Sequence, residues 1–265
     1  MLQQVTAQEY VRASRNGRTR PILLVCTDAV GGEVELYAKV SRRCDEGATN
    51  LVREAIAACL AADLGLPIMQ PFLVDMPPAW IASITDATLR ADIDASAFIA
   101  FGSRIAGSQF AAWHPGVTLR AEMVASALAI FTFDAIIQNV DRRVENPNCL
   151  VLGPNLRIID HELAFAQRLM IGWRPPWTPG AMQSLTMPPG LHIFYTGLRK
   201  QSLDFTPVRA AWSALPDGRI DDYAAALPSA WGGAASQAAA DAIRLIKDAR
   251  DHIDGCLAEV QRVLT

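Results

Sequence analysis

The N-terminal part of the chain alternates between apolar runs typical of strands and one stretch with helical spacing. Two apolar runs within residues 21–40 flank Gly31-Gly32, and this arrangement predicts a β-hairpin. Residues 49–67 place their apolar side chains at the spacing of a helix. Short apolar runs between residues 68 and 101 are separated by turn sequences, so we expect an antiparallel sheet accompanied by a helix.

Helical spacing dominates the remainder of the chain. Residues 118–139 predict a long helix that is apolar enough to be mostly buried, and residues 234–264 predict an amphipathic helix. Between them, residues 149–152 and 156–159 form two short β runs on either side of a Gly-Pro-Asn turn. The pattern therefore predicts an α+β protein whose strands gather in its first half.

Length and composition agree with two packed parts. The 265 residues, 51% of them hydrophobic, can bury a sizeable core. A boundary near residues 102–117 would separate a β-rich part, 1–102, from a helical part, 103–265. The net charge of −3 gives no broad basic field, so we expect no nucleic-acid partner.

The sequence pattern predicts neither a signal peptide nor a membrane-spanning helix. Its first residues lack the apolar core of a signal peptide, and the most apolar helical stretch, 123–133, is too short to span a bilayer. The five cysteines are widely spaced and form no C-x-x-C pair, which argues against a disulfide framework and a structural zinc site. We therefore expect a soluble cytoplasmic protein.

Lys39 is unusual among the three lysines because it lies in the apolar strand sequence "VELYAKV". One interpretation is an edge-strand lysine whose ammonium reaches water. The other is a phosphate-binding lysine held by a helix glutamate, as in kinases, since a buried ammonium costs several kcal/mol unless it is paired. Glu54 offers that partner from the helix capped by Thr49 or Asn50, although it could also pair with Arg53 or face solvent.

The polar stretch "NVDRRVEN" follows the apolar helix directly and contains Asp141 and Asn146. Phosphoryl transfer needs a carboxylate that orients the attacking hydroxyl, and an oxygen ligand for magnesium nearby. An aspartate followed five residues later by an asparagine supplies both from one turn. The spacing alone is a weak signal, because it occurs often by chance.

Asp160 strengthens this interpretation. It ends the predicted hairpin "CLVLGPNLRIID", and a hairpin returns its end close to its start, which would bring Asp160 beside Asn146 as a second magnesium ligand. The alternative is an aspartate that caps the next turn. His161 and Glu162 follow, but Phe165 occupies the position where H-E-x-x-H requires a histidine, so zinc is not expected.

Two arginines in the same stretch have open roles. Arg142 and Arg143 could bind substrate or phosphate, or pair with Glu145 and Glu162 as scaffold. The chain has no G-x-S-x-G, Walker A or G-x-G-x-x-G sequence.

The segments "FDAIIQNVDRRVENPNCLV" and "LRIIDHELAF" resemble the short HipA-like kinases of bacteria, and more distantly the type II phosphatidylinositol 4-kinases. "LYAKV" is similar to the nucleotide-lysine strand of that family, "REAIAACLAADLGLPI" to the helix after it, and "FIAFGSR" lies where its hinge is expected. The resemblance implies an ATP-dependent phosphotransferase with a bilobal, protein-kinase-like fold. It would have a small β-rich N-lobe, 1–102, and a larger helical C-lobe, 103–265.

The resemblance also implies roles for single residues. Asp141 would be the catalytic base, Asn146 and Asp160 would hold Mg²⁺, and Lys39 would contact the phosphates of ATP. Asn148 is a rival to Asn146, but the five-residue spacing favours the latter.

Four further residues are candidates for nucleotide binding, together with Glu54 as the partner of the lysine. Gly31 and Gly32 could cover the phosphates with backbone N–H groups, because glycine permits close approach. Backbone groups around Phe101 and Gly102 could bind adenine.

The expected function is a magnesium-dependent kinase that acts on a serine or threonine hydroxyl of a protein. The alternatives are a kinase of a lipid headgroup or small metabolite, a nucleotide-binding pseudokinase that serves as an interaction module, and a structural domain without ligand. An antitoxin-type partner is a further alternative, which the lack of the extra N-terminal region of full-length HipA toxins disfavours. Asp160-His161-Glu162 replaces the Asp-Phe-Gly turn of ordinary protein kinases.

Overall fold

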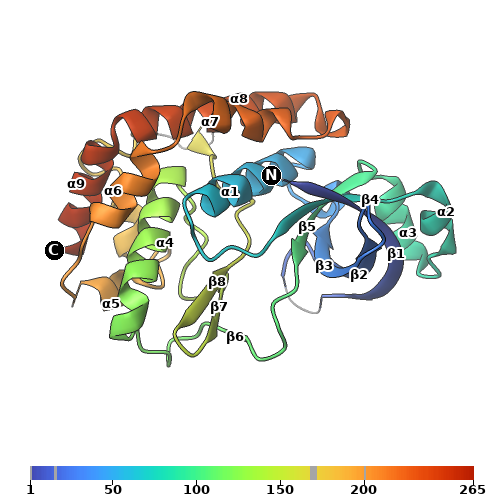
Figure 1. The fold of residues 1–265 in the computed structure, drawn as a ribbon, viewed down its shortest axis with the longest axis horizontal. Coiled ribbons are helices and arrows are strands. Elements are labelled where there is room, and N and C mark those ends of the chain that lie inside the picture. The colour runs from blue at the N-terminus through green and yellow to red at the C-terminus, as the bar shows by residue number, and fades with distance from the viewer. Residues whose placement is uncertain (1, 15–16, 168–171, 200) are drawn as a thin grey trace.

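The computed structural model describes residues 2–14, 17–167, 172–199 and 201–265. Its N-terminal part is rich in strands and its C-terminal part is mostly helical, in agreement with the predicted order of elements (Figure 1). Within the described residues, no helix is long and apolar enough to cross a membrane.

Five strands close into a barrel in the order β1-β2-β3-β5-β4. They are β1 (Gln3–Ala13), β2 (Ile22–Thr27), β3 (Glu33–Lys39), β4 (Pro71–Asp75) and β5 (Ile99–Arg104). The predicted hairpin is confirmed as the antiparallel pair β2–β3. The sheet is antiparallel as expected except where β1 runs parallel to β4 and closes the barrel.

Alternate residues of these strands fill the barrel with apolar side chains, including the fully buried Ile22, Leu24 and Leu36. Gly102 on β5 belongs to this interior: a Cβ at that position would lie 2.7 Å from Cγ2 of Val74. The close packing of β5 against its neighbours therefore requires a glycine there. The predicted boundary after residue 102 falls within β5, and it stays a prediction.

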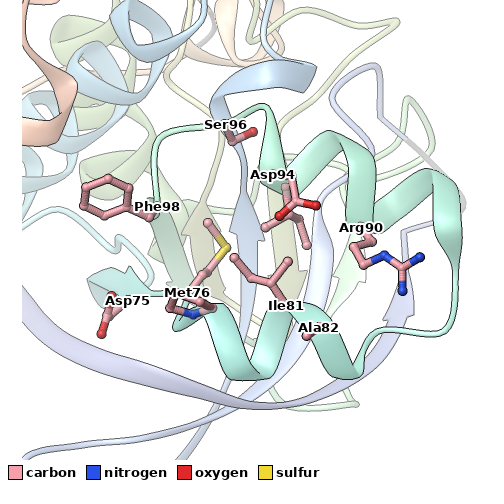
Figure 2. A pocket seen from close by; sticks show the side chains of 10 residues that line it. Asp75, Met76, Ile81, Ala82, Arg90, Asp94, Ser96 and Phe98 are labelled. Carbon is pink, nitrogen blue, oxygen red and sulfur yellow. The ribbon is translucent and has the colours of Figure 1, made fainter.

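Helices α2 (Pro78–Ser83) and α3 (Ala87–Asp94) connect β4 to β5 at the outer end of the barrel (Figure 1). Asp86 caps α3 by accepting hydrogen bonds from the N–H groups of Thr88 and Leu89. A pocket of about 620 Å³ lies between these helices and the adjoining strand ends, with Phe98 at its margin (Figure 2). None of the predicted site residues lines it.

Helix α1 (Ala48–Asp63) follows the barrel strand β3 in sequence, yet it packs in the core of the helical part, under α8 (Ala234–Asp251) (Figure 1). Its N-cap is Gly47, so the prediction of a cap at Thr49 or Asn50 is wrong by two or three residues. A glycine with a φ of 59° makes the turn into the helix. Asn50 lies within the first turn, where its side-chain oxygen accepts a bond from the N–H of Glu46.

Helix α4 (Val124–Ile137) is buried over most of its surface, as expected, but it is shorter than the predicted 118–139. A 3-10 turn, Ala121–Met123, precedes it, and Gln138 ends it in a left-handed conformation with a φ of 59°. The predicted β runs are confirmed as the hairpin β7 (Cys149–Leu152) and β8 (Asn155–Ile158).

The remaining elements complete the helical part. The short strand β6 (Ala111–Ala112) pairs with β7, and the other helices are α5 (Tyr195–Leu198), α6 (Thr206–Ser213), α7 (Asp217–Ala225) and α9 (Ile253–Leu264). The C-terminal helix predicted over 234–264 is two helices, α8 and α9, because the chain leaves helical geometry at His252.

Candidate functional site

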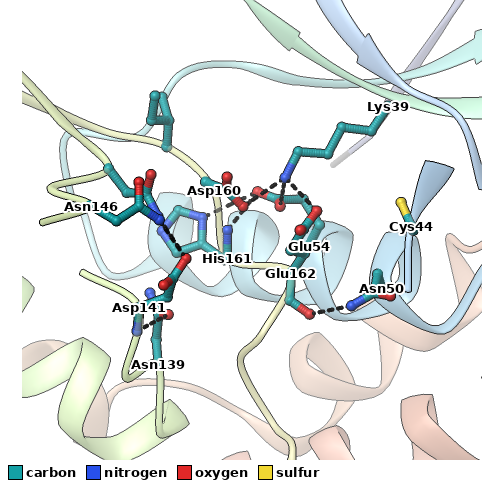
Figure 3. A network of polar contacts seen from close by, with 12 residues as sticks. Lys39, Cys44, Asn50, Glu54, Asn139, Asp141, Asn146, Asp160, His161 and Glu162 are labelled. Atoms are coloured by element: carbon teal, nitrogen blue, oxygen red, sulfur yellow. Dashed lines mark hydrogen bonds and ion pairs between the residues drawn. The ribbon is translucent and has the colours of Figure 1, made fainter. Parts of the chain in front are cut away.

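Lys39 is the last residue of β3, and its ammonium lies among three carboxylates from distant parts of the chain (Figure 3). Its Nζ atom lies 2.8 Å from Glu54 Oε2, 2.7 Å from Asp160 Oδ1 and 2.9 Å from Glu162 Oε2. Because β3 pairs with β2 and β5 in a closed barrel, the edge-strand interpretation is wrong. Burial opposes the charge, but the three carboxylates raise the pKa of Lys39 well above its ordinary value.

Glu54 points inward from α1 and connects Lys39 to the end of β8. Its Oε1 atom accepts a hydrogen bond of 2.9 Å from the backbone N–H of His161 and lies 3.3 Å from Nδ1 of the same residue. Burial opposes ionisation, but Lys39 and His161 hold the pKa of Glu54 well below its usual range. Arg53, the alternative partner, binds Glu46 instead. The expected Lys39–Glu54 contact is present, and its role in nucleotide binding stays a prediction.

Glu162 is a third partner of Lys39 that the sequence did not predict. Its backbone oxygen accepts a bond of 3.0 Å from Nδ2 of Asn50, which fixes the segment after Asp160 to α1. Burial raises the pKa of Glu162 to about 7; Lys39 opposes this shift and Asp160 adds to it. The sequence feature that could have predicted this contact is the position of Glu162, two residues after Asp160 at the acidic end of the strand sequence.

Asp141 lies in the loop after α4, where two amides hold its carboxylate (Figure 3). Oδ2 accepts bonds of 2.7 Å from Asn146 Nδ2 and 3.3 Å from Asn148 Nδ2. Oδ1 lies 3.7 Å from the guanidinium of Arg143. Burial raises the pKa of Asp141, and the negative charge of Asp160 raises it further. A carboxylate with a raised pKa, whose Oδ1 accepts no hydrogen bond from the described residues, can accept a proton from a hydroxyl group.

A cluster of fully buried polar side chains, centred on Asp134, stabilises this loop. Asp134 on α4 accepts bonds from Arg142 at 2.6 Å and 3.2 Å, from Asn139 at 2.9 Å and from His192 Nε2 at 3.1 Å. Burial opposes its ionisation, but Arg142 and His192 hold the pKa of Asp134 well below its usual range. The role of Arg142 is therefore structural, and its partner is neither Glu145 nor Glu162.

Arg142 also connects the loop of Asp141 to the end of β8. Its guanidinium donates to the backbone oxygen of Asn148 and, at 3.1 Å, to that of Ile159. It lies 2.9 Å from Nε2 of His161, and because an arginine can only donate, this nitrogen accepts. One buried side chain thus holds the residues next to Asp141 and Asp160 in fixed positions.

The oxygen atoms in this region fit the requirements of a divalent cation. Asn146 donates a hydrogen bond from Nδ2 to Asp141, while its Oδ1 has no hydrogen-bond partner among the described residues. Asp160 adopts a φ of 61°, a conformation that is rare outside glycine and is often found at functional sites. Carboxylate oxygens of Glu54, Asp160 and Glu162 lie within 4.8 Å of one another around the Lys39 ammonium, which binds one oxygen of each. Mg²⁺ prefers such ligands, so the residues present fit it.

The remaining candidates lie in the barrel. The N–H of Gly32 donates to Asp28 Oδ1 at 2.7 Å and that of Gly31 to the backbone oxygen of Asp28 at 3.1 Å, so both N–H groups that were predicted to meet phosphates have a partner within the turn. Gly31 has a φ of 86°, which the turn requires. Phe101 and Gly102 are paired on both sides, with β3 and β4. Their roles in binding ATP stay predictions.

Replacing His192 with glutamine is expected to make the fold less sensitive to mild acid. Its Nε2 donates to Asp134, and its Nδ1 accepts from the N–H of Phe194 at 3.2 Å. Burial lowers the pKa of His192, and Asp134 only partly opposes this shift. As the pH falls below about 6.5, the unfolded chain therefore binds a proton that the folded chain does not, and the free energy of unfolding decreases.

The measurement is urea denaturation at about pH 7.5 and about pH 5.5. The His192→Gln protein should lose less stability between the two pH values than the wild type. Equal losses in both proteins would show that His192 does not contribute to the acid sensitivity.

Comparison with known proteins places these residues in a family. The sequence profile of the HipA-like kinases matches residues 7–172, more than half of the chain. The crystal structure of the Helicobacter pylori proinflammatory kinase CtkA is similar in fold, with a TM-score of 0.56, 9% sequence identity and coverage of 100% of both chains. No curated protein matches the sequence. The profile match includes Lys39, Asp141 and Asp160, and we conclude that the chain belongs to the HipA-like kinase family and is a kinase.

Proposed function

We propose that this kinase has two lobes and transfers the γ-phosphoryl group of ATP, with magnesium, to a serine or threonine hydroxyl of a protein. The barrel forms the small lobe, the helices from α4 onward form most of the large one, and ATP binds between them. The observation that carries the proposal is the convergence of the barrel lysine Lys39 with Asp160, whose charge acts on Asp141.

Each side chain has a separate task in this proposal. Lys39 binds the phosphates of ATP and is held in place by Glu54 and Glu162. Asp160 and Asn146 would hold Mg²⁺, and the ion would supply positive charge that neutralises the phosphates. The hydrogen bonds from Asn146 and Asn148 hold Asp141 in the orientation that it needs toward the acceptor.

The reaction balances without any further reactant. The acceptor oxygen forms a bond to the γ-phosphorus, and the bond between that phosphorus and the β–γ bridging oxygen breaks, so ADP leaves. The hydroxyl proton passes to Oδ1 of Asp141. Positioning and neutralisation of charge supply most of the rate enhancement in reactions of this kind.

Replacing Asp160 with asparagine tests the proposed metal site. The variant should lose most of the difference between ATP binding with and without Mg²⁺, with Mg²⁺-ATP affinity falling about tenfold or more, because one charged ligand is removed. Thermal unfolding with ATP, in magnesium or in chelator, measures this difference. Transfer of labelled γ-phosphate to the protein itself or to added proteins measures turnover.

Asp94→Asn is the matched control, because Asp94 is an exposed aspartate on α3. It should behave as the wild type in both assays. If Asp160→Asn keeps the full magnesium dependence of ATP binding, the metal ligands lie elsewhere. If the wild type binds Mg²⁺-ATP but transfers phosphate to no acceptor, the chain is a pseudokinase and the proposed activity is wrong.

A further inference from the structure

A second pocket, of about 400 Å³, lies in the helical part beside the catalytic loop. Six of its ten lining residues are apolar: Trp113, Pro115, Val117, Leu119, Val144 and Ile193. Val144 is 36% exposed, which is unusual for a large hydrophobic residue in this chain. The volume falls within the range of pockets that bind ligands in other proteins.

The pocket shares residues and a backbone hydrogen bond with the loop of Asp141. Val144 follows Asp141 by three residues, so their Cα atoms are at most about 11 Å apart at 3.8 Å per step. Ile193, another lining residue, donates its N–H to the backbone oxygen of Arg142 at 3.2 Å. A group bound in the pocket therefore lies at a restricted distance from the carboxylate that receives the acceptor proton.

The chemistry of the pocket selects among the acceptor classes. None of the described residues in its lining carries a charge, and its polar members are the neutral Thr118, Thr196 and Gln201. A phosphorylated metabolite or an anionic lipid headgroup would require arginine or lysine side chains beside it. A polypeptide segment needs only an apolar wall for a side chain and neutral groups for its backbone amides.

We propose that this pocket binds an apolar side chain of a polypeptide acceptor, close in sequence to the hydroxyl that is phosphorylated. The proposal rests on the proposed function and adds to it a determinant of acceptor choice. An extended peptide advances about 3.3 Å per residue, so a span equal to the Val144–Asp141 Cα limit of about 11 Å corresponds to about three positions between the apolar residue and the serine or threonine. Burial of its side chain supplies the affinity, and the catalytic loop supplies the chemistry.

Peptides with one central serine and a leucine moved through the three positions on each side test this inference. At one or more of these positions, leucine should raise kcat/KM about tenfold or more above asparagine at the same place, because a buried leucine gains that much in binding. Thr196→Glu should remove this preference by placing a charge in the pocket. Thr196 is exposed, so the fold tolerates the change.

The matched control is Thr88→Glu, the same substitution at an exposed threonine of α3 outside the pocket. It should keep the leucine preference. Equal Mg²⁺-ATP thermal shifts in both variants would show that the nucleotide site is intact. A leucine preference that Thr196→Glu removes and Thr88→Glu keeps supports the pocket.

Four outcomes overturn the inference, and they separate it from the proposed function. Phosphorylation of peptides without a leucine preference, or with a preference that survives Thr196→Glu, rejects the pocket and leaves the kinase activity standing. Phosphorylation of phosphatidylinositol vesicles, with no peptide accepted, identifies a lipid acceptor. ATP binding without transfer to any acceptor rejects the proposed function and the inference together.

Discussion

Replacing Asp141 with asparagine is expected to lower kcat by about 10²–10⁴-fold, because the variant loses the base that receives the hydroxyl proton. Asparagine has nearly the same size but cannot accept that proton at neutral pH. Mg²⁺-ATP affinity should change little, since the proposed metal and phosphate contacts belong to Asp160, Asn146 and Lys39. Initial rates of γ-phosphate transfer, with ATP affinity measured in parallel, test this expectation.

Two comparisons make the Asp141 result specific. Asn146 and Asn148 donate to Asp141 in the wild type, so thermal unfolding of the variant should be measured to establish that the loop keeps its fold. Asp94→Asn should retain the wild-type kcat. A kcat for Asp141→Asn within about threefold of the wild type would contradict the assignment of the base.

The second large effect concerns stability. Asp134→Ala is expected to lower the free energy of unfolding by about 3–5 kcal/mol, because it leaves the guanidinium of Arg142 buried without its carboxylate. Both side chains are fully buried in the wild type, and His192 would lose its acceptor as well. Urea denaturation at neutral pH measures the loss.

Asp222→Ala on α7 is a suitable control, because Asp222 is an exposed helical aspartate. Its effect should remain within about 0.5 kcal/mol. If Asp134→Ala destabilises the protein no more than this control, water or another acceptor compensates Arg142, and the buried cluster is not what fixes the loop of Asp141.

The sequence predicted the parts of the site that depend on local spacing. The β7–β8 hairpin returns Asp160 toward the loop of Asp141, and turn residues with alternating strands specify such a hairpin. The Lys39–Glu54 contact could also be predicted from the sequence, because a buried ammonium in an apolar strand needs an acidic partner, and the next apolar helix supplies one.

The parts that the sequence did not predict depend on distant packing. Strand β1 closes the barrel by pairing with β4, about seventy residues away, and its polar residues give no strong strand period. His192 reaches Asp134 across 58 positions of sequence. Asp134 itself carried a usable signal, since a single acid within an apolar helix must find a buried partner.

The position of α1 determines which fragments of this protein would keep their core packing. The helix follows β3 in sequence, but thirteen of its sixteen residues are buried, largely among helices of the C-terminal part. A fragment ending at residue 102 would carry Lys39 and Glu54 together yet expose the apolar face that α8 covers. The complementary fragment would have a vacant groove in its core. We therefore expect the strand-rich and helical parts to unfold as one cooperative unit, and truncation after residue 102 would remove Asp160 and Glu162, two of the charge partners of Lys39.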